Sequence, residues 1–221
     1  MINIRRFQEA PPCLERRTNY KCGDTIDRLE ADFLGKCYLC ETDQFSINVE
    51  HHTPHKNNPD LKFKWKNLFF ACDHCNSLKS EDIILDCTDP GIDVEERISY
   101  RSIFFPEHEV FIKPKKYDNK TKQTAKLLSK IFNGTSTIRT IGASKLRRFL
   151  VEEMIHFQGL MLEYEKHKHN PLKSEEVETK IAAELHASSK LTAFKRQIIK
   201  DNEKYFKKFG KYLKAYEVKM D

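Results

Sequence analysis

Apolar residues recur with a period of two in one short stretch of the N-terminal part of the chain. Phe45, Ile47 and Val49 alternate with polar neighbours, which is the pattern of a half-buried strand. A second apolar run covers residues 65–70, and the prolines and asparagines of residues 52–61 predict a loop between the two runs. Because the residues after the second run suit a helix, the predicted order is strand, turn, strand, helix.

Helical spacing dominates the rest of the chain. The N-terminal residues up to about residue 20 read as an irregular arm. The predicted helices and strands are a short helix over residues 24–33, strands at 98–100 and 110–112 with a turn at Pro106, and helices carrying apolar stripes over 125–132, 146–164 and 191–213. Asn170-Pro171 predicts a break, after which Ser174 is the expected cap of a further helix. We therefore predict an α+β fold with one domain at residues 1–118 and a mainly helical region at 119–221.

Composition narrows the class of protein only a little. The 221 residues carry a formal net charge of +6, and the isoelectric point of about 8.8 permits a phosphate-backbone partner without requiring one. No apolar leader is apparent, and no window approaches the roughly 18 apolar residues of a membrane span. A reducing cytoplasm is therefore the predicted compartment, where paired cysteines favour metal binding over disulfides.

Two pairs of cysteines have the spacing of zinc ligands. Cys37 and Cys40 form one C-x-x-C pair, and Cys72 and Cys75 form another about thirty residues later. Four thiolates would close a tetrahedral zinc site and leave no open position, so the sequence predicts a structural zinc. The alternative is four unrelated buried cysteines. The remaining cysteines, Cys13, Cys22 and Cys87, are expected to be small buried side chains or free thiols.

An acid and two histidines lie between the cysteine pairs. A histidine suits a general base near neutral pH, and the carboxylate of Glu50 is a hard oxygen donor of the kind that magnesium prefers. Neighbouring strand residues point to opposite faces, so Glu50 and His51 share a direction only if the strand ends there, as Pro54 suggests. The alternatives are a surface pair formed by His51 and His52, or a histidine that binds zinc at another site.

Two asparagines and two lysines complete the candidate chemistry. The amide of Asn67 would pin the loop that carries the histidines, and the oxygen of Asn76 would face that loop as a metal ligand. Lys56 and Lys79 would contact phosphates. Taken singly, each asparagine is better explained as a cap or turn residue, and only the joint pattern favours a site.

These residues together resemble a known family. The sequence EHHTP followed by KNLFFACDHCNSLK, framed by the two C-x-x-C pairs, resembles the HNH endonucleases of the zinc-stapled ββα-metal class over residues 37–80. The resemblance implies that Glu50 binds a catalytic Mg²⁺ or Mn²⁺, that His51 activates the attacking water, that Asn67 is structural and that Asn76 is a second metal ligand. Glu50 replaces the commoner aspartate.

Two features of this pattern leave alternatives open. His52 stands where many members have an apolar residue, so either histidine is a candidate base; His51 is preferred because it directly follows the acid. The implied reaction is hydrolysis of a phosphodiester in DNA or in RNA such as tRNA, with His52, Lys56 and Lys79 contacting the nucleic acid.

The layout of the whole chain also resembles the PtuB family of HNH effectors from Septu-type anti-phage systems, some of which accompany retrons. This second resemblance implies a partner ATPase of the PtuA type, and possible association with a retron reverse transcriptase and its DNA. The C-terminal helices would then be a partner-docking or regulatory region, although they would equally serve as a cover for the nuclease core.

Two other classes of function remain open. A non-catalytic zinc-ribbon module that binds nucleic acid or protein needs the four cysteines but not Glu50, His51 and Asn76 together. A structural subunit with a degenerate HNH core would also fit, because Glu50 departs from the usual aspartate. The joint presence of the three residues favours the enzyme.

Overall fold

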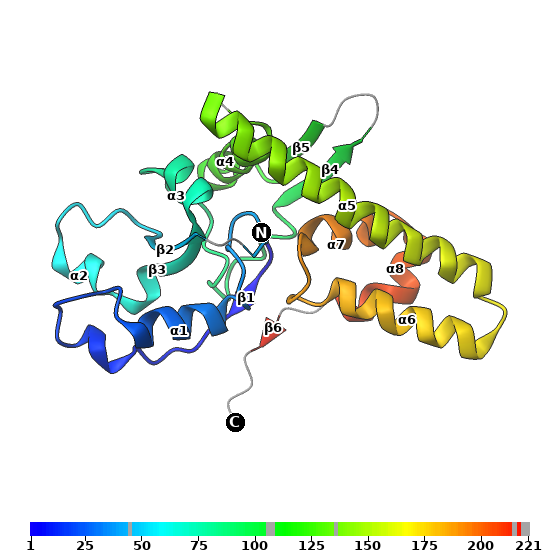
Figure 1. The fold of residues 1–221 in the computed structure, drawn as a ribbon, viewed down its shortest axis with the longest axis horizontal. Helices are drawn as coiled ribbons and strands as arrows, with labels where there is room; N and C mark the ends of the chain where they lie inside the picture. The colour runs from blue at the N-terminus through cyan, green and yellow to red at the C-terminus, as the bar shows by residue number, and fades with distance from the viewer. Residues whose placement is uncertain (44–45, 105–108, 135–136, 214–215, 218–221) are drawn as a thin grey trace.

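The chain combines small sheets with a largely helical C-terminal half (Figure 1). The computed structural model describes the backbone of residues 1–43, 46–104, 109–134, 137–213 and 216–217, and the side chains of these except for 137–140 and 216–217. Phe45 and Pro106, which the sequence assigned to a strand and a turn, lie outside the described residues. The α+β class predicted from the sequence is confirmed.

The N-terminal segment leads into the first helix. It contains strand β1 (Ile4–Arg5), a 3-10 turn at Pro12–Leu14 and helix α1 (Gly23–Asp32), which lies within one residue of the predicted helix. β1 pairs in parallel with the short strand β6 (Tyr216–Glu217) near the other end of the chain. The arm between β1 and α1 is closed by a disulfide between Cys13 and Cys22. That bond corrects the expectation that these two cysteines are small buried side chains or free thiols.

The predicted order of strand, strand and helix is present. Strand β2 (Ile47–His51) pairs antiparallel with β3 (Leu68–Cys72), and α3 (Asp73–Lys79) follows directly. Every residue of β3 is buried, which explains why its sequence is a continuous apolar run instead of an alternating one. The connecting loop contains one short helix, α2 (Pro59–Lys62), and a 3-10 turn at Trp65–Asn67.

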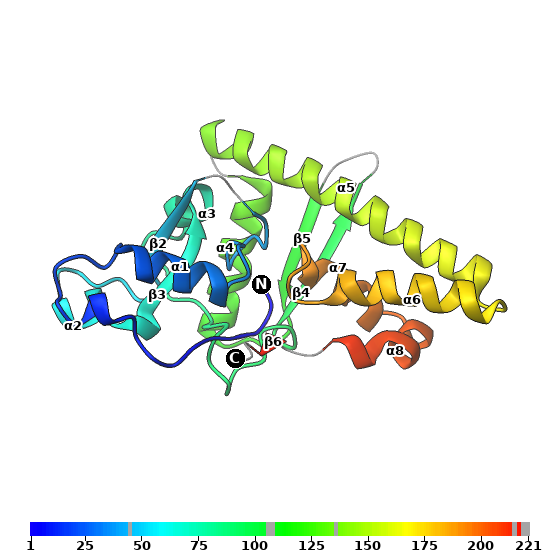
Figure 2. The same cartoon turned by 60° about the horizontal axis from the view of Figure 1, so that its bottom comes forward.

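A second hairpin and the long helices follow. β4 (Ile98–Ile103) and β5 (Glu109–Pro114) pair antiparallel, and β5 packs on α4 (Asn119–Asn133), which ends before Gly134 at a φ of 83°. Helix α5 (Thr137–His167) has 31 residues and runs along both halves of the molecule (Figures 1 and 2). The remaining helices are α6 (Pro171–Leu185), α7 (Thr192–Lys200) and α8 (Glu203–Phe209), followed by a 3-10 turn at Gly210–Tyr212.

Two predicted helix boundaries were wrong. Asn170, not Ser174, caps α6: its side-chain oxygen accepts a hydrogen bond from the Lys173 N–H at 3.3 Å, and Pro171 occupies the first turn. A proline is tolerated there because the first N–H groups of a helix have no intrahelical partner. The apolar stripe over 191–213 is also not one helix, because Asn202 starts a new one by accepting from the Tyr205 N–H at 3.2 Å.

The buried apolar side chains form two clusters among the described residues. The larger cluster joins the hairpins, α1, α3 and α4 to the N-terminal half of α5 and the start of α7. The smaller one lies between the C-terminal half of α5, α6 and α8, and includes Phe157, Ile181 and Phe209. The larger cluster continues across residue 118, where the sequence placed a domain boundary, and that boundary stays a prediction. Across the described segments, no helix has both the length and the apolar character to cross a bilayer.

Candidate active site and metal centre

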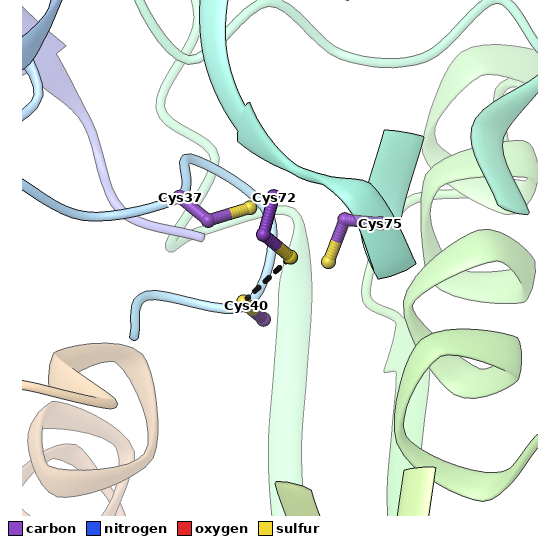
Figure 3. A group of neighbouring side chains, drawn as sticks. All are labelled: Cys37, Cys40, Cys72 and Cys75. Atoms are coloured by element: carbon purple, nitrogen blue, oxygen red, sulfur yellow. Dashed lines mark hydrogen bonds between the residues drawn. The ribbon is translucent and has the colours of Figure 1, made fainter. Parts of the chain in front are cut away.

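The four paired cysteines meet at one point. Cys37 and Cys40 lie in the turn after α1, Cys72 ends β3 and Cys75 lies in the first turn of α3. All four are buried, and their sulfur atoms lie within 4.8 Å of one another. Figure 3 shows the four sulfur atoms turned toward a common centre. The predicted cysteine cluster is therefore confirmed, and in the described parts of the chain it is the one group of three or more potential metal-binding His, Cys, Asp or Glu side chains.

The cluster fits a zinc ion in size and chemistry. Zn–S bonds of about 2.3 Å in a tetrahedron place sulfur atoms about 3.8 Å apart, and the Cys40 and Cys72 sulfurs are 3.9 Å apart. Burial raises the pKa of the Cys37 thiol, but hydrogen bonds from the other three cysteines outweigh this effect and hold that pKa well below its usual value of 9.0. A thiolate in a dry pocket needs a counter-cation, which a zinc ion supplies.

Glu50 does not offer a free carboxylate. It lies on the buried side of β2 and is 4 % exposed. One carboxylate oxygen, Oε1, is 2.7 Å from the ammonium nitrogen of Lys79, which has no exposed surface, and the other, Oε2, accepts a hydrogen bond from the Tyr38 hydroxyl at 2.9 Å. Burial and the charge of Glu50 raise the pKa of Tyr38 well above its usual value, so the phenol keeps its proton and donates.

This arrangement does not fit the predicted catalytic metal. A divalent ion at Glu50 would sit against the Lys79 ammonium, and the buried carboxylate has already matched both oxygens to donors. Asn76 lies half-exposed in the middle of α3. In this conformation Glu50 is a structural partner of Lys79. The assignment of Lys79 to phosphate contact is corrected as well, because the side chain points into the protein and its Nζ also lies 3.3 Å from the His51 carbonyl oxygen.

His51 lies on the other side of the strand and is half-buried. Its Nε2 is 3.0 Å from the carbonyl oxygen of Lys62. A carbonyl only accepts, so Nε2 carries the proton and Nδ1 keeps a lone pair in the neutral ring. Desolvation lowers the pKa of His51 below its usual 6.5. The imidazole is therefore neutral at pH 7, with one nitrogen able to accept a proton.

Aromatic rings enclose His51 from two directions. The Tyr20 ring lies edge-on at a centroid distance of 4.7 Å, and the His55 ring lies at 4.5 Å. Tyr20 belongs to the segment that the Cys13–Cys22 disulfide closes. Tyr20, Tyr38 and His55 were not predicted from the sequence, because their contacts join segments whose docking no local pattern reports. The EHHTPH stretch does place His55 four residues after His51 in a loop, which was the one available signal.

His52 has a different environment. It is buried, its ring packs on Phe69 at a centroid distance of 4.8 Å, and its Nε2 lies 3.2 Å from the Leu85 carbonyl oxygen. Burial lowers its pKa, so it is a neutral core side chain. The structure therefore corrects the prediction that His52 contacts nucleic acid. Between the two histidines, His51 has the geometry that suits a base.

Asn67 joins the two ends of the histidine loop. Its side-chain oxygen accepts from the Thr53 N–H at 2.7 Å, and its Nδ2 donates to the carbonyl oxygens of Thr53 and Leu61 at 2.8 and 3.0 Å. The Asn67 carbonyl also accepts from the His52 N–H at 2.9 Å. Lys56 remains exposed at the tip of this loop, with its ammonium 3.1 Å from Glu81.

Comparison of the chain with protein-family models, with curated proteins and with solved structures gave no match.

Proposed function

We propose that the chain is a zinc-stapled HNH-type endonuclease that hydrolyses phosphodiester bonds in nucleic acid, with His51 as the general base. The observation that carries this proposal is the neutral His51 imidazole, whose Nε2–H is held by the Lys62 carbonyl while Nδ1 remains an acceptor. The Cys37, Cys40, Cys72 and Cys75 cluster, loaded with zinc, would hold β3 and α3 against the strand that carries this histidine.

The chemistry at His51 follows from its tautomer. Nδ1 takes a proton from a water molecule, and the oxygen of that water forms a bond to phosphorus as the bond to the leaving oxygen breaks. The Lys62 carbonyl stabilises the resulting imidazolium by accepting from Nε2–H throughout the step. Asn67 holds the two ends of the histidine loop together, so the His51 imidazole keeps its orientation when substrate binds. The mechanism places no divalent ion at Glu50, because its two carboxylate oxygens already contact the Lys79 ammonium and the Tyr38 hydroxyl.

The direct test compares wild-type protein with His51→Ala and His52→Ala on plasmid DNA and on tRNA, with zinc retained. We expect His51→Ala to lose cleavage by about 10²–10⁴-fold, the usual contribution of a general base. His52→Ala removes a buried core side chain, so we expect it to lower the stability of the protein and not the chemical step. Both variants are therefore compared at a temperature where circular dichroism shows them folded. Equal cleavage by wild type and His51→Ala would remove the enzyme proposal.

A second candidate function is a zinc module that binds nucleic acid without cutting it. The buried Glu50–Lys79 pair favours this alternative, because it removes the acid that the family resemblance assigns to metal binding. Retained binding to DNA or RNA, with no cleavage by the wild-type protein in the presence of magnesium or manganese, would select it.

The biological setting is proposed from the sequence resemblance alone. We propose that the chain is the effector of an anti-phage system with a PtuA-type ATPase partner, and that the exposed face of the C-terminal helices is available for docking. Co-expression with such an ATPase followed by size-exclusion chromatography tests this partner, and separate elution of the two proteins would contradict it.

A further inference from the structure

We infer that His55 is a second functional residue of this site, which donates a hydrogen bond from its Nε2–H to a non-bridging oxygen of the scissile phosphate. This inference rests on the proposed function and deepens it. It assigns to His55 the phosphate contact that was predicted for His52 and Lys79, both of which are buried.

The position of His55 next to His51 is the first observation. His55 is half-buried, and its ring lies at a centroid distance of 4.5 Å from the ring of His51, at an interplanar angle of 63°. A phosphate whose attacking water is in reach of His51 is therefore also close to His55. The neighbouring Lys62 gives this loop a positive charge that favours a phosphate, whereas the charge of Lys56 is paired with Glu81.

The second step is the tautomer. The backbone N–H of Asn57 points at the Nδ1 atom of His55, at an N···N distance of 3.1 Å. Nδ1 therefore acts as an acceptor, and the proton of the neutral ring resides on Nε2. Within the part of the chain that the structure describes, no protein group forms a hydrogen bond with His55 Nε2. His51 has the opposite arrangement: its Nε2–H forms a hydrogen bond within the protein, and its Nδ1 is the acceptor that faces the substrate in this proposal.

The third step is the rigidity of the loop. Lys56 and Asn57 both have positive φ, 42° and 64°, a conformation that costs free energy for residues other than glycine. Because of this bend the Asn57 N–H points toward the His55 ring, and the Asn58 N–H donates to the His55 carbonyl at 2.7 Å. The Asn58 side chain then caps α2 by accepting from the Asp60 N–H at 2.9 Å. Successive hydrogen bonds thus hold the ring in one orientation before substrate arrives.

The two imidazoles would have complementary roles in one reaction, because one accepts a proton and the other stabilises negative charge. His51 removes the proton from water, and His55 stabilises the negative charge that develops on the phosphoryl oxygens while keeping its own proton. Because His55 donates a hydrogen bond without transferring its proton, the proton of the attacking water passes to His51 Nδ1 and from there to solvent, and the leaving oxygen takes a proton from solvent. The proton balance is that of the hydrolysis itself.

The kinetic test uses two substitutions of His55 with opposite effects on the donor. His55→Phe keeps a ring beside His51 and removes the N–H, whereas His55→Gln keeps an N–H donor at a similar reach. We expect His55→Phe to lower kcat by about 10²-fold with little change in KM, as for removal of one donor to a transition state. We expect His55→Gln to retain most of the wild-type kcat. His169→Phe, at an exposed histidine after α5, is the matched control and should match the wild type.

The outcomes separate this inference from the proposed function. If His51→Ala abolishes cleavage and His55→Phe cleaves like the wild type, the role of His55 is overturned and His51 remains the base. If His55→Phe raises only KM, or if His55→Gln is as impaired as His55→Phe, a transition-state donor is also overturned.

A second readout does not depend on activity. Nitrogen-15 NMR of the histidine rings in the zinc-loaded protein at pH 7.5 should show His51 and His55 both protonated at Nε2, and titration with dimethyl phosphate should shift His55 Nε2. Protonation of His55 at Nδ1 would overturn the inference whatever the substrate is.

Discussion

Glu50, His51 and His52 are consecutive residues, yet each has a different chemical environment. Glu50 pairs with Lys79 inside the protein, His51 faces the loop around Lys62, and His52 packs on Phe69. The alternation of a strand explains why the first two residues have different partners. The candidate base is therefore distinguished from its neighbour by burial and hydrogen bonding, not by residue type.

The pH dependence of cleavage tests the environment of His51. Its pKa lies below 6.5 because desolvation disfavours the imidazolium, so the neutral base persists to lower pH than in an unfolded chain. We expect kcat/KM to rise with pH to a plateau, with the midpoint of the acidic limb below 6.5. The stabilising contribution of neutral His51 is present above pH 6.5 and is lost as pH falls from there through the folded-state pKa.

Tyr20→Ala supplies the control for this pH profile. Removing the ring that covers His51 admits water to the imidazole, so the midpoint of the acidic limb should move upward toward 6.5. A wild-type midpoint above 6.5, or an unchanged midpoint in Tyr20→Ala, would contradict the desolvated environment.

The buried ion pair makes a separate prediction about stability. Lys79→Met leaves the Glu50 carboxylate buried without its counter-charge, and we expect a loss of about 3–5 kcal/mol in the free energy of unfolding. The double variant Glu50→Gln with Lys79→Met should recover most of this loss. Urea denaturation measures the free energy of unfolding of both variants.

The matched control is Lys56→Met, which breaks the exposed Lys56–Glu81 pair and should lower the free energy of unfolding by less than about 1 kcal/mol. Equal effects of the two single variants would show that Lys79 is not buried as described.

At the scale of elements, local patterns predicted type and order better than boundaries and contacts. Residues 24–33 gave a helix because Leu29 and Phe33 repeat at helical spacing, and both are buried. The cysteine spacing predicted the four-cysteine cluster because each of its two pairs is local in sequence. The Cys13–Cys22 disulfide and the Glu50–Lys79 pair were not predicted, because both depend on how separate segments dock. Asn170 and Ser174 are both good caps by type, and only backbone conformation decided between them.

The contact between α3 and α5 provides a prediction at this scale. His74, inside the second cysteine pair, donates from Nε2 to the Ile131 carbonyl at 2.9 Å, and its ring lies against Gly142 of α5. A Cβ atom at Gly142 would lie 2.8 Å from His74 Nδ1, so Gly142→Ala should destabilise the protein by about 1–3 kcal/mol.

Gly159 is the matched control in the same helix. A Cβ atom there would meet no atom within 4 Å, and an alanine is a better helix former than glycine. Gly159→Ala should therefore raise the free energy of unfolding by up to about 1 kcal/mol. Thermal denaturation of the two variants measures the difference, and a destabilised Gly159→Ala with a neutral Gly142→Ala would contradict the packing of α5 on the cysteine knuckle.

At the scale of the molecule, the cysteine knuckle is tied to the helical half. Glu41 follows Cys40 directly, and its backbone and side-chain oxygens accept from the N–H groups of Leu191 and Ala193 at the start of α7, at 3.1 and 2.9 Å. The ammonium of the buried Lys36 donates to the carbonyl oxygens of Ala187 and Ser189. The turn that carries the first cysteine pair is thus also the support for the segment between α6 and α7.

Loss of zinc should therefore loosen two regions that are distant in sequence. Without the ion, no metal–sulfur bonds join the four cysteines, and the turn at residues 36–42 loses the link that fixes it to β3. Hydrogen exchange on zinc-loaded and chelated protein should show faster exchange at residues 37–42 and, in the same step, at residues 187–193. Helices α6 and α8 pack in the smaller apolar cluster and should keep their protection from exchange longer.

Cys87→Ala is the control, because Cys87 is buried outside the four-cysteine cluster and its substitution should leave zinc content unchanged. Unaltered exchange at residues 187–193 after zinc removal would mean that the helical half holds its position without the knuckle.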